Sequence, residues 1–491
     1  MRKLVAFTLT MVFGLTISFG QRRYIDTMFT HVSVSKNVMY GWNYTTYINP
    51  PNPDSVALMM DVYQPVGDTV TNRPVVILAH SGSFLPKCTA NTLPFGDKED
   101  SAMVEMCTLL AKRGYVAVSM DYRLGWNPVA INQDDRTGTL ITAIYLAMQD
   151  MKACVRYMKS RSIAYNIDKN KIVVGGSNSG GYVALTCGAL TDTNELRLFK
   201  FLHSSTGKPM IDIQKWGDFD GNNGTPGYFN YNTPTESNEV QLILNLGGAI
   251  LDTSWINAGE PPIIAYHGVA DSLTPYKTFP PPILWPMPTN LEIFGSYYVC
   301  KVAQNNGNQN LHGKHFNDKY TLEAKSKNEG IDGLFPFFGP DRGYEPWAWY
   351  DIGSPCIGPA PPSGSGTGSS VNPWATKTRA IAYIDTIIGY FCPRAVQVLR
   401  LSGNTVGLYN YPDINKSIDV YPNPSDDIIY IQSENEFKSV MIYDVHGKLI
   451  YSDLNENNFK MQMDVSTLQK GMYIMNIETG EGISRKKIVV Q

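Results

Sequence analysis

The chain has 491 residues, of which 43% are hydrophobic and 17% are charged. This length exceeds one small domain and favours about two or three domains, one of which can be a large α/β domain. With 41 basic and 44 acidic residues the formal net charge is −3, and no basic block occurs, which argues against a nucleic-acid-binding protein. The seven cysteines include no CxxC pair, so neither a zinc module nor thioredoxin-type chemistry is indicated.

The first twenty residues have the pattern of an export signal. Arg2 and Lys3 precede an uncharged apolar run that ends in small residues at Gly20. This order is typical of a cleaved secretory signal peptide, so we predict a signal at 1–20 and cleavage before Gln21. The alternative is an uncleaved membrane anchor, because the run is near the lower length limit for crossing a bilayer.

Strand and helix patterns alternate from residue 57 to residue 394. Alternating or continuous apolar runs predict strands, and apolar residues that recur every three or four positions predict helices. Repeated strand–helix–strand units predict an α/β fold, with a mostly parallel sheet and helices on both of its faces. The predicted strands are 57–65, 74–79, 115–120, 171–174, 241–246 and 262–266, and the predicted helices are 103–110, 137–158, 180–190, 294–303 and 380–391.

Changes in composition set the predicted domain limits. The stretch 280–371 is rich in proline, glycine and aromatic residues and has little regular period, so we predict a long insertion within a first domain at 21–400. A linker at 401–416 follows. Short alternating strands at 428–431, 440–443, 473–477 and 488–490 then predict a small β-sandwich at 417–491.

A glycine-rich turn, Gly-Gly-Ser-Asn-Ser-Gly-Gly at 175–181, follows the predicted strand 171–174 and precedes a helix. Gly-x-Ser-x-Gly in this position is the nucleophile elbow of α/β-hydrolases, where a sharp turn lifts a serine above the sheet. Over 57–394 the chain resembles secreted α/β-hydrolases of the carboxylesterase and feruloyl-esterase type. The resemblance implies hydrolysis of a small-molecule or polysaccharide-linked carboxylic ester through an acyl-enzyme, without a cofactor.

The register of this turn decides its chemistry. When the strand and the pair Gly180-Gly181 both keep the family pattern, the nucleophile position falls on Asn178, whose carboxamide cannot form an ester intermediate. A nucleophilic Ser177 would leave a serine where the elbow requires glycine, and a nucleophilic Ser179 would shorten the turn by one residue. We favour Asn178 at the apex and retain the two serines as alternatives.

A second motif, His-Ser-Gly-Ser-Phe at 80–84, directly follows a predicted strand. It is similar to the His-Gly-Gly-Gly-type turn of the family. The resemblance implies an oxyanion hole formed by the N–H of Gly82 or Ser83 together with the N–H of Ser179. After the next strand, Asp-Tyr-Arg-Leu-Gly also matches the family, and we predict that its Arg123 anchors the loop.

A third motif, His-Gly-x-x-Asp-x-x-x-Pro, resembles the loop that bears the acid of the catalytic triad, and its aspartate, Asp271, is the candidate acid. In the family's chain order the histidine follows the acid. His312 and His315 are candidates for the base if a short strand occupies 309–311. A rival alignment places the last strand at 334–338, and the residues that follow it include no histidine.

These motifs leave two functions open, and whether the protein is an enzyme stays uncertain. An active esterase would use Ser179 or Ser177 with a histidine that Asp271 orients. The alternative is a catalytically lapsed hydrolase that serves as a surface binding or adhesion protein. Lapse is plausible because the nucleophile and base of a triad are nearly useless without each other.

One loop carries oxygen side chains at alternate positions, as loops that bind hard cations do. It lacks the glycine and the glutamate of a calcium-binding loop, so an Asx-rich turn is favoured over a metal site. The metal candidates are Asp218, Asp220 and Asn222.

The tail at 417–491 carries motifs of its own. It opens with Tyr-Pro-Asn-Pro, continues with Tyr-Asp-x-x-Gly-Lys and Leu-x-x-Gly-Met-Tyr, and ends in a basic segment. These features resemble the type A C-terminal sorting domain of type IX secretion. The resemblance implies contact with the type IX secretion machinery, then release or attachment at the cell surface. The alternative, a carbohydrate-binding module, would need exposed aromatic residues for its ligand, and the absence of tryptophan from the tail argues against it.

Overall fold

The computed structural model describes residues 22–45, 54–87, 96–228, 235–279, 291–312, 316–339, 344–349, 376–401, 418–444, 449–453, 458–479 and 483–491. The chain divides into two compact units, one within residues 1–406 and one within residues 407–491. The predicted signal peptide at 1–20 lies outside the described residues. Among the helices in the described ranges, none is long and apolar enough to span a membrane.

An eight-stranded sheet forms the centre of the first unit, in the order β1-β2-β4-β3-β5-β6-β8-β11. β1 and β4 both pair antiparallel with β2, and every pairing from β4 to β11 is parallel. The predicted, mostly parallel sheet is therefore confirmed. The strands are β1 (Val32–Thr45), β2 (Asp54–Pro65), β3 (Arg73–Ala79), β4 (Val116–Met120), β5 (Ile167–Ser177), β6 (Leu242–Leu246), β8 (Ile263–Gly268) and β11 (Leu334–Phe337).

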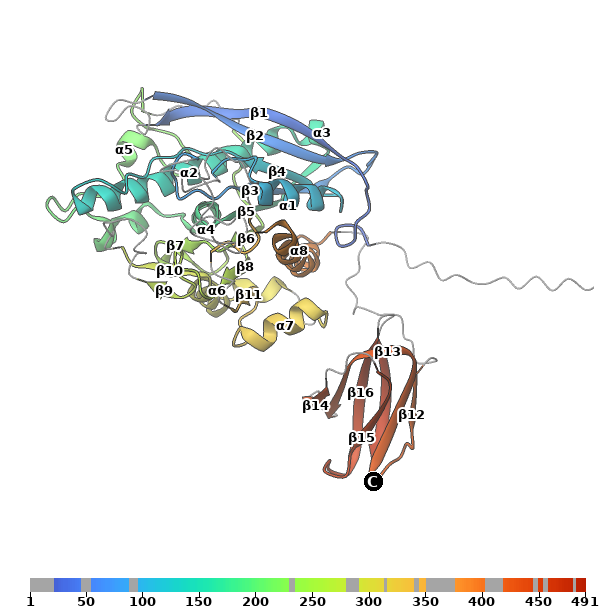
Figure 1. The fold of residues 1–491 in the computed structure, drawn as a ribbon. Coiled ribbons are helices and arrows are strands. Elements are labelled where there is room, and N and C mark those ends of the chain that lie inside the picture. Colours follow the sequence, from blue (N-terminus) through green and yellow to red (C-terminus); the bar gives the residue numbers. More distant parts are fainter. Residues whose placement is uncertain are drawn as a thin grey trace, which may run out of the picture. The chain divides into compact units, whose positions relative to one another are not determined.

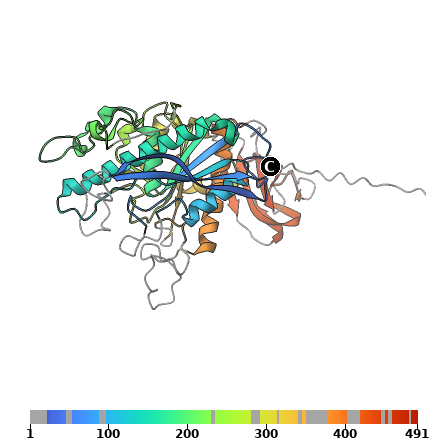
Figure 2. The ribbon, with the colours of Figure 1, turned by 90° about the horizontal axis from the view of Figure 1, so that it is seen from above.

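Helices cover both faces of this sheet, as Figure 1 shows and as the view from above in Figure 2 repeats. One face packs against α2 (Gln133–Ser160), α4 (Ser179–Ala189) and α6 (Ser296–Asn305). The other packs against α1 (Ser101–Ala111) and α8 (Lys377–Val398). Parallel strands need such cover because both of their faces are apolar. The smaller elements are α3 (Ser162–Tyr165), α5 (Ile213–Trp216), α7 (Lys319–Lys327), and the short strands β7 (Ala249–Ile250), β9 (Thr278–Phe279) and β10 (Ile293–Gly295).

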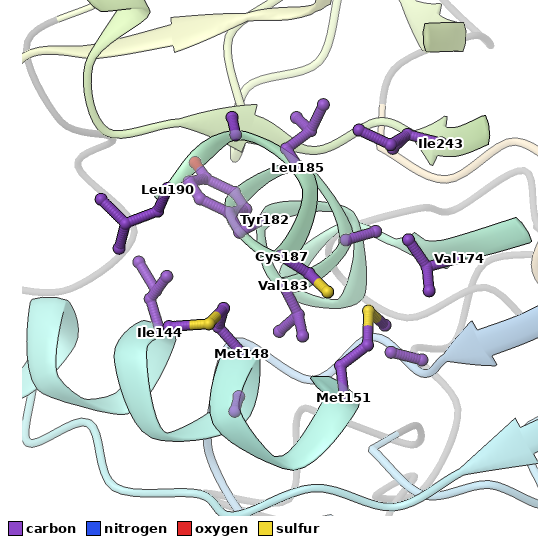
Figure 3. Close-up of a cluster of buried hydrophobic side chains, with 14 of the residues drawn as sticks. Ile144, Met148, Met151, Val174, Tyr182, Val183, Leu185, Cys187, Leu190 and Ile243 are labelled. Carbon is purple, nitrogen blue, oxygen red and sulfur yellow. The ribbon is translucent and has the colours of Figure 1, made fainter. Parts of the chain in front are cut away.

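Helix α4 lies between α2 and the sheet, and its side chains interlock with those of α2 (Figure 3). Ile144, Met148 and Met151 project from α2 at helical spacing, and α4 meets them with Val183 and Cys187. Burying one such aliphatic side chain contributes about 1.5–3 kcal/mol. This cluster therefore fixes α4, and with it the turn that precedes α4.

Five cysteines among the described residues are free, and all five are buried. Four of them lie in predicted helices, and burial raises the pKa of each thiol: Cys107, Cys154, Cys187 and Cys300. The fifth, Cys392, directly follows the predicted helix 380–391. A thiol in this state acts as a small apolar side chain.

A fully buried ion pair ties the loop after β4 to α2. The Nη2 atom of Arg123 lies 2.8 Å from Oδ1 of Asp150, and both side chains are 0% exposed. The guanidinium also donates to the carbonyl oxygens of Tyr44 at 3.2 Å and Leu146 at 3.1 Å. The predicted anchoring role of Arg123 is therefore confirmed, since these contacts join the loop to both β1 and α2.

The second unit is a six-stranded antiparallel sheet around a hydrophobic core of its own. The predicted small all-β domain is confirmed. Two strands that the sequence pattern predicts separately, 428–431 and 440–443, are parts of one long strand, β13. The strands are β12 (Ile418–Tyr421), β13 (Ile428–Asp444), β14 (Leu449–Asp453), β15 (Asn458–Asp464), β16 (Gly471–Thr479) and β17 (Ile483–Val490).

Replacing Arg123 by alanine leaves the carboxylate of Asp150 buried without its cation. We expect the free energy of unfolding of the first unit to fall by about 3–5 kcal/mol. Urea unfolding followed by tryptophan fluorescence reports on this unit alone, because all 8 tryptophans precede residue 375. The exposed Arg197→Ala is the control and should change stability by less than about 0.5 kcal/mol. Equal stability of the two variants would contradict the anchoring role.

Candidate active site

The turn between β5 and α4 has a strained backbone at its apex. Asn178 has φ 46° and ψ −108°, a conformation that residues with side chains rarely adopt. Ser177 is the last residue of β5, and Ser179 is the first of α4. The structure thus places Asn178 at the apex between the two serines.

Two glycines let this turn pack against the sheet. A Cβ atom on Gly180 would lie 2.1 Å from the carbonyl oxygen of Ala79, and one on Gly176 would lie 2.4 Å from the backbone of Gly180. Any larger residue at either position would displace backbone, so both positions require glycine. Packing alone explains these glycines, whatever chemistry the turn performs.

The side chain of Asn178 is 4% exposed. Its Nδ2 donates a hydrogen bond to Oγ1 of Thr274 at 2.8 Å, and its backbone N–H donates to the carbonyl oxygen of Leu246 at 2.8 Å. A carboxamide nitrogen has no available lone pair, because that pair is delocalised into the carbonyl. The group at the apex therefore binds neighbours and cannot attack an ester.

The structure brings Ser179 to the turn predicted as an oxyanion hole. The backbone N–H of Ser83 donates to Oγ of Ser179 at 3.1 Å, and the hydroxyl of Tyr122 lies 3.0 Å from the same oxygen. Gly82 and Ser83 have φ angles of 120° and 53°, which turn this backbone toward α4. One of the N–H groups proposed to hold an oxyanion is thus directed at a serine hydroxyl.

A segment after β11 packs against the other flank of the apex. Oγ of Ser177 donates to the carboxyl group of Glu345 and accepts a hydrogen bond from Nε1 of Trp347 at 2.8 Å. The hydroxyl of Tyr344 lies 2.9 Å from Oγ of Ser81. All three residues of the segment are at most 2% exposed. No motif or spacing in the sequence pointed to Glu345.

His312, one of the two candidates for the base, does not approach the acid. A 3₁₀ helix occupies 308–312, so the short strand on which the candidacy of these histidines depended is not formed, and β11 has the place of the rival alignment. Nε2 of His312 lies 3.0 Å from the carbonyl oxygen of Ile263, at the start of β8, whereas Asp271 follows the end of β8. Burial lowers the pKa of His312 to about 3. His315 lies outside the described residues.

Asp271 is bonded within its own loop. Its Oδ1 accepts the N–H groups of Leu273 at 2.8 Å and Thr274 at 3.0 Å. Its Oδ2 lies 3.8 Å from Nε2 of His267, a ring that also contacts Ser296 and the Thr274 carbonyl and is structural. Burial raises the pKa of Asp271 to about 8, so the carboxyl group is mostly neutral at pH 7. A neutral carboxyl group stabilises an imidazolium poorly.

A second carboxyl group faces the same site. Burial raises the pKa of Glu345, although hydrogen bonds from Ser177, Ser81 and Tyr344 oppose the shift. The negative charge of Glu345 also raises the pKa of Asp271. Within the described ranges, no imidazole forms a hydrogen bond with Ser177 or with either residue that follows it. Hydroxyl and carboxyl groups therefore surround the apex.

The loop of metal candidates forms a hydrogen-bonded turn. Oδ1 of Asp218 accepts the N–H groups of Asp220 at 3.0 Å and Asn222 at 2.8 Å. These bonds are typical of the Asx-rich turn that the sequence favours. In the part of the chain that the structure describes, no group of three or more His, Cys, Asp or Glu side chains could hold a metal ion.

Comparisons with known proteins support both resemblances. Residues 60–279 match the family BD-FAE, feruloyl-esterase-like α/β-hydrolases, and residues 419–491 match the secretion system C-terminal sorting domain. No curated protein sequence matches the chain.

Among solved structures, the chain is similar to Thermogutta terrifontis esterase 2. The apo form is 14% identical, with 75% of this chain and 94% of that chain covered and a TM-score of 0.36. The propionate-bound form is 16% identical, with 74% and 94% covered and a TM-score of 0.36. The form phosphorylated by paraoxon is 15% identical, with 68% and 92% covered and a TM-score of 0.36.

The chain thus carries a feruloyl-esterase-like α/β-hydrolase domain followed by a C-terminal sorting domain. The sorting domain indicates export through type IX secretion, to the cell surface or the extracellular space. It also implies contact with the machinery of that system. The predicted resemblance and localisation are confirmed.

Burial of Asp271 predicts a specific pH dependence of stability. Its folded-state pKa of about 8 lies above the value of roughly 4 in an unfolded chain. The folded state therefore binds the proton more tightly, and the resulting stability is fully present below about pH 4 and lost as the pH rises to about 8. As the pH rises from 5 to 8, we expect the free energy of unfolding of wild type to fall by a few kcal/mol relative to that of Asp271→Asn, whose amide does not ionise.

Urea unfolding followed by tryptophan fluorescence at a series of pH values measures this difference. The amide of Asp271→Asn keeps an oxygen that can accept the two loop N–H groups, so the variant should fold. Asp385→Asn, at an exposed position of α8, is the matched control and should keep the wild-type pH profile. If Asp271→Asn also keeps that profile, Asp271 is ionised in the folded protein and its assignment here is wrong.

Proposed function

We propose that the first unit of this exported protein acts by binding a ligand, as a lapsed member of the carboxylesterase-like α/β-hydrolases. The observation that carries the proposal is the carboxamide of Asn178 at the apex of the turn, bonded to Thr274. Formation of an acyl-enzyme requires an activated hydroxyl or thiol at that point. An amide cannot replace either group.

The surroundings of Ser177 give further support. Glu345 and Trp347 contact its hydroxyl from the segment after β11, where the family's chain order would place the catalytic histidine. Nucleophile and base work as a unit, so the loss of one removes the constraint on the other. The turn keeps Gly180 because packing requires it, and the loop keeps Asp271 because its oxygen accepts two backbone N–H groups.

Hydrolysis of carboxylic esters is the second candidate function. One observation favours it, since Oγ of Ser179 lies in hydrogen-bond contact with the N–H of Ser83 in the oxyanion turn. In that case Ser179 or Ser177 would attack a small-molecule or polysaccharide-linked ester, and Asp271 would orient His315. Against it, burial raises the pKa of Tyr122, so the hydroxyl beside Ser179 stays protonated and is no base.

Turnover of p-nitrophenyl acetate and labelling by a fluorophosphonate probe separate the two functions. For the mature wild-type protein we expect the same background rate as for Ser179→Ala and Ser177→Ala, and no labelled serine. Asn178→Ser restores a hydroxyl at the apex, and we expect the probe to label it only slowly, because this variant still lacks a base. Adding Glu345→His to Asn178→Ser supplies an imidazole beside the turn. We expect this double variant to be labelled about 100-fold faster than Asn178→Ser alone.

Ester turnover by the wild-type protein would contradict the proposal if Ser179→Ala or Ser177→Ala abolished it. That result would identify the serine concerned as the nucleophile of an acyl-enzyme. Thr186→Ala, on α4 and away from the apex, controls for effects on folding.

A further inference from the structure

We infer that the first unit binds a neutral sugar residue in a pocket formed by α2, α5 and the end of β1. The inference deepens the proposed binding function and rests on it. The pocket has a volume of about 220 Å³, and residues 177–179 do not line it. At roughly 30 Å³ of liquid per water molecule, this space corresponds to roughly seven waters. It can hold one sugar ring, but it is smaller than the ~300 Å³ and more of sites for larger ligands.

An aromatic ring and aliphatic side chains form the apolar part of the lining. Leu146 of α2 and Met210 contribute aliphatic surface, and Trp216 of α5 contributes its indole. The indole is held by an edge-to-face contact with Tyr228, at 5.7 Å between ring centroids, and by Nζ of Lys215 at 4.6 Å from its ring. The indole is only 6% exposed, so it contributes a small and rigid apolar surface to the lining, against which C–H groups of a sugar ring can pack.

The polar part of the lining offers both donors and acceptors. Thr139 and Thr142 of α2 line the pocket, and the hydroxyl of Thr142 donates to the carbonyl oxygen of Met210 at 3.4 Å. A hydroxyl oxygen that donates its proton in this way still accepts hydrogen bonds. His203 also lines the pocket. Together these groups match a ligand that carries several hydroxyl groups.

The charges of the lining favour a neutral ligand. Asp135 and Lys215 both line the pocket, and their formal charges cancel. An anionic ligand would have to approach the carboxylate, and a cationic ligand would have to approach the ammonium group. Sugar hydroxyl groups can donate to Asp135 and accept from Lys215 at once, so a neutral polyhydroxy ligand satisfies both.

Gly138 keeps the pocket open from within α2. A Cβ atom there would lie 3.7 Å from Cε1 of His203 and 3.8 Å from Cβ of Met210, which are ordinary contact distances. Alanine would therefore fit without strain, and glycine inside a helix costs about 0.5–1 kcal/mol relative to alanine. Packing does not demand this glycine, in contrast to Gly180 in the turn. Access for a ligand explains it, because a longer side chain would extend into the lining.

Saturation-transfer NMR and titration calorimetry on the mature protein test the inference. The probes are glucose, galactose, mannose and xylose, each as the free sugar and as a linear trisaccharide. We expect at least one of them to bind, and we expect Gly138→Leu and Lys215→Met each to weaken its affinity by about tenfold or more. A trisaccharide that binds more tightly than its monomer identifies a glycan as the source of the sugar, and equal affinity identifies the free sugar.

The exposed Lys208→Ala, from the loop that supplies His203, is the matched control and should bind as wild type does. Gly138→Leu removes no contact of the folded chain, and its urea midpoint verifies that it folds. Absence of saturation transfer from every probe at millimolar concentration would overturn the inference. Undiminished binding by a folded Gly138→Leu would do the same. Serine-dependent esterase activity would overturn the proposed function alone, since the pocket assay does not involve the apex.

Discussion

The approach of α4 to the end of β3 determines the geometry of the whole apex. Gly180 lies so near the carbonyl oxygen of Ala79 that no other residue fits, and the α2–α4 cluster presses the helix into this position. The strained conformation of Asn178 and the placement of Ser179 beside Ser83 both follow from that contact. Because the contact involves backbone atoms, it does not depend on the side chain at the apex. The shape of a catalytic turn can therefore outlast its nucleophile.

The carboxyl ends of parallel strands are where open α/β sheets usually bind ligands. In this unit Glu345 and Trp347 contact Ser177 in that region, and the carboxyl group of Asp271 is buried close by. A pocket lined by described residues lies elsewhere, beside α2 and α5. The two regions also differ electrically. Buried acids that resist ionisation surround the apex, whereas the pocket carries one charge of each sign.

Much of the fold could be predicted from the sequence, because continuous apolar runs such as 74–79 read directly as buried parallel strands. The edge strand β1 could not be predicted, since the N-terminal half of the strand is mostly exposed and bulges interrupt its pairing with β2. Asn178 could be predicted at the apex from the spacing between the strand 171–174 and the pair Gly180-Gly181. Glu345 was missed because it lies 168 residues from Ser177 in an irregular segment, and no local spacing encodes such a contact. His312 was a candidate for the base only by chain order, and chain order does not tell which end of a strand a polar loop reaches.

The buried cysteines bear on how such a chain tolerates export. Exported proteins often rely on disulfide bonds for stability, yet the five cysteines in the described ranges sit as separate thiols inside the apolar cores. Because their sulfur atoms are shielded and their ionisation is suppressed, oxidants outside the cell meet no thiolate until the unit unfolds. These five positions therefore need no oxidative maturation step, and their sulfur atoms keep the same covalent state on both sides of the envelope.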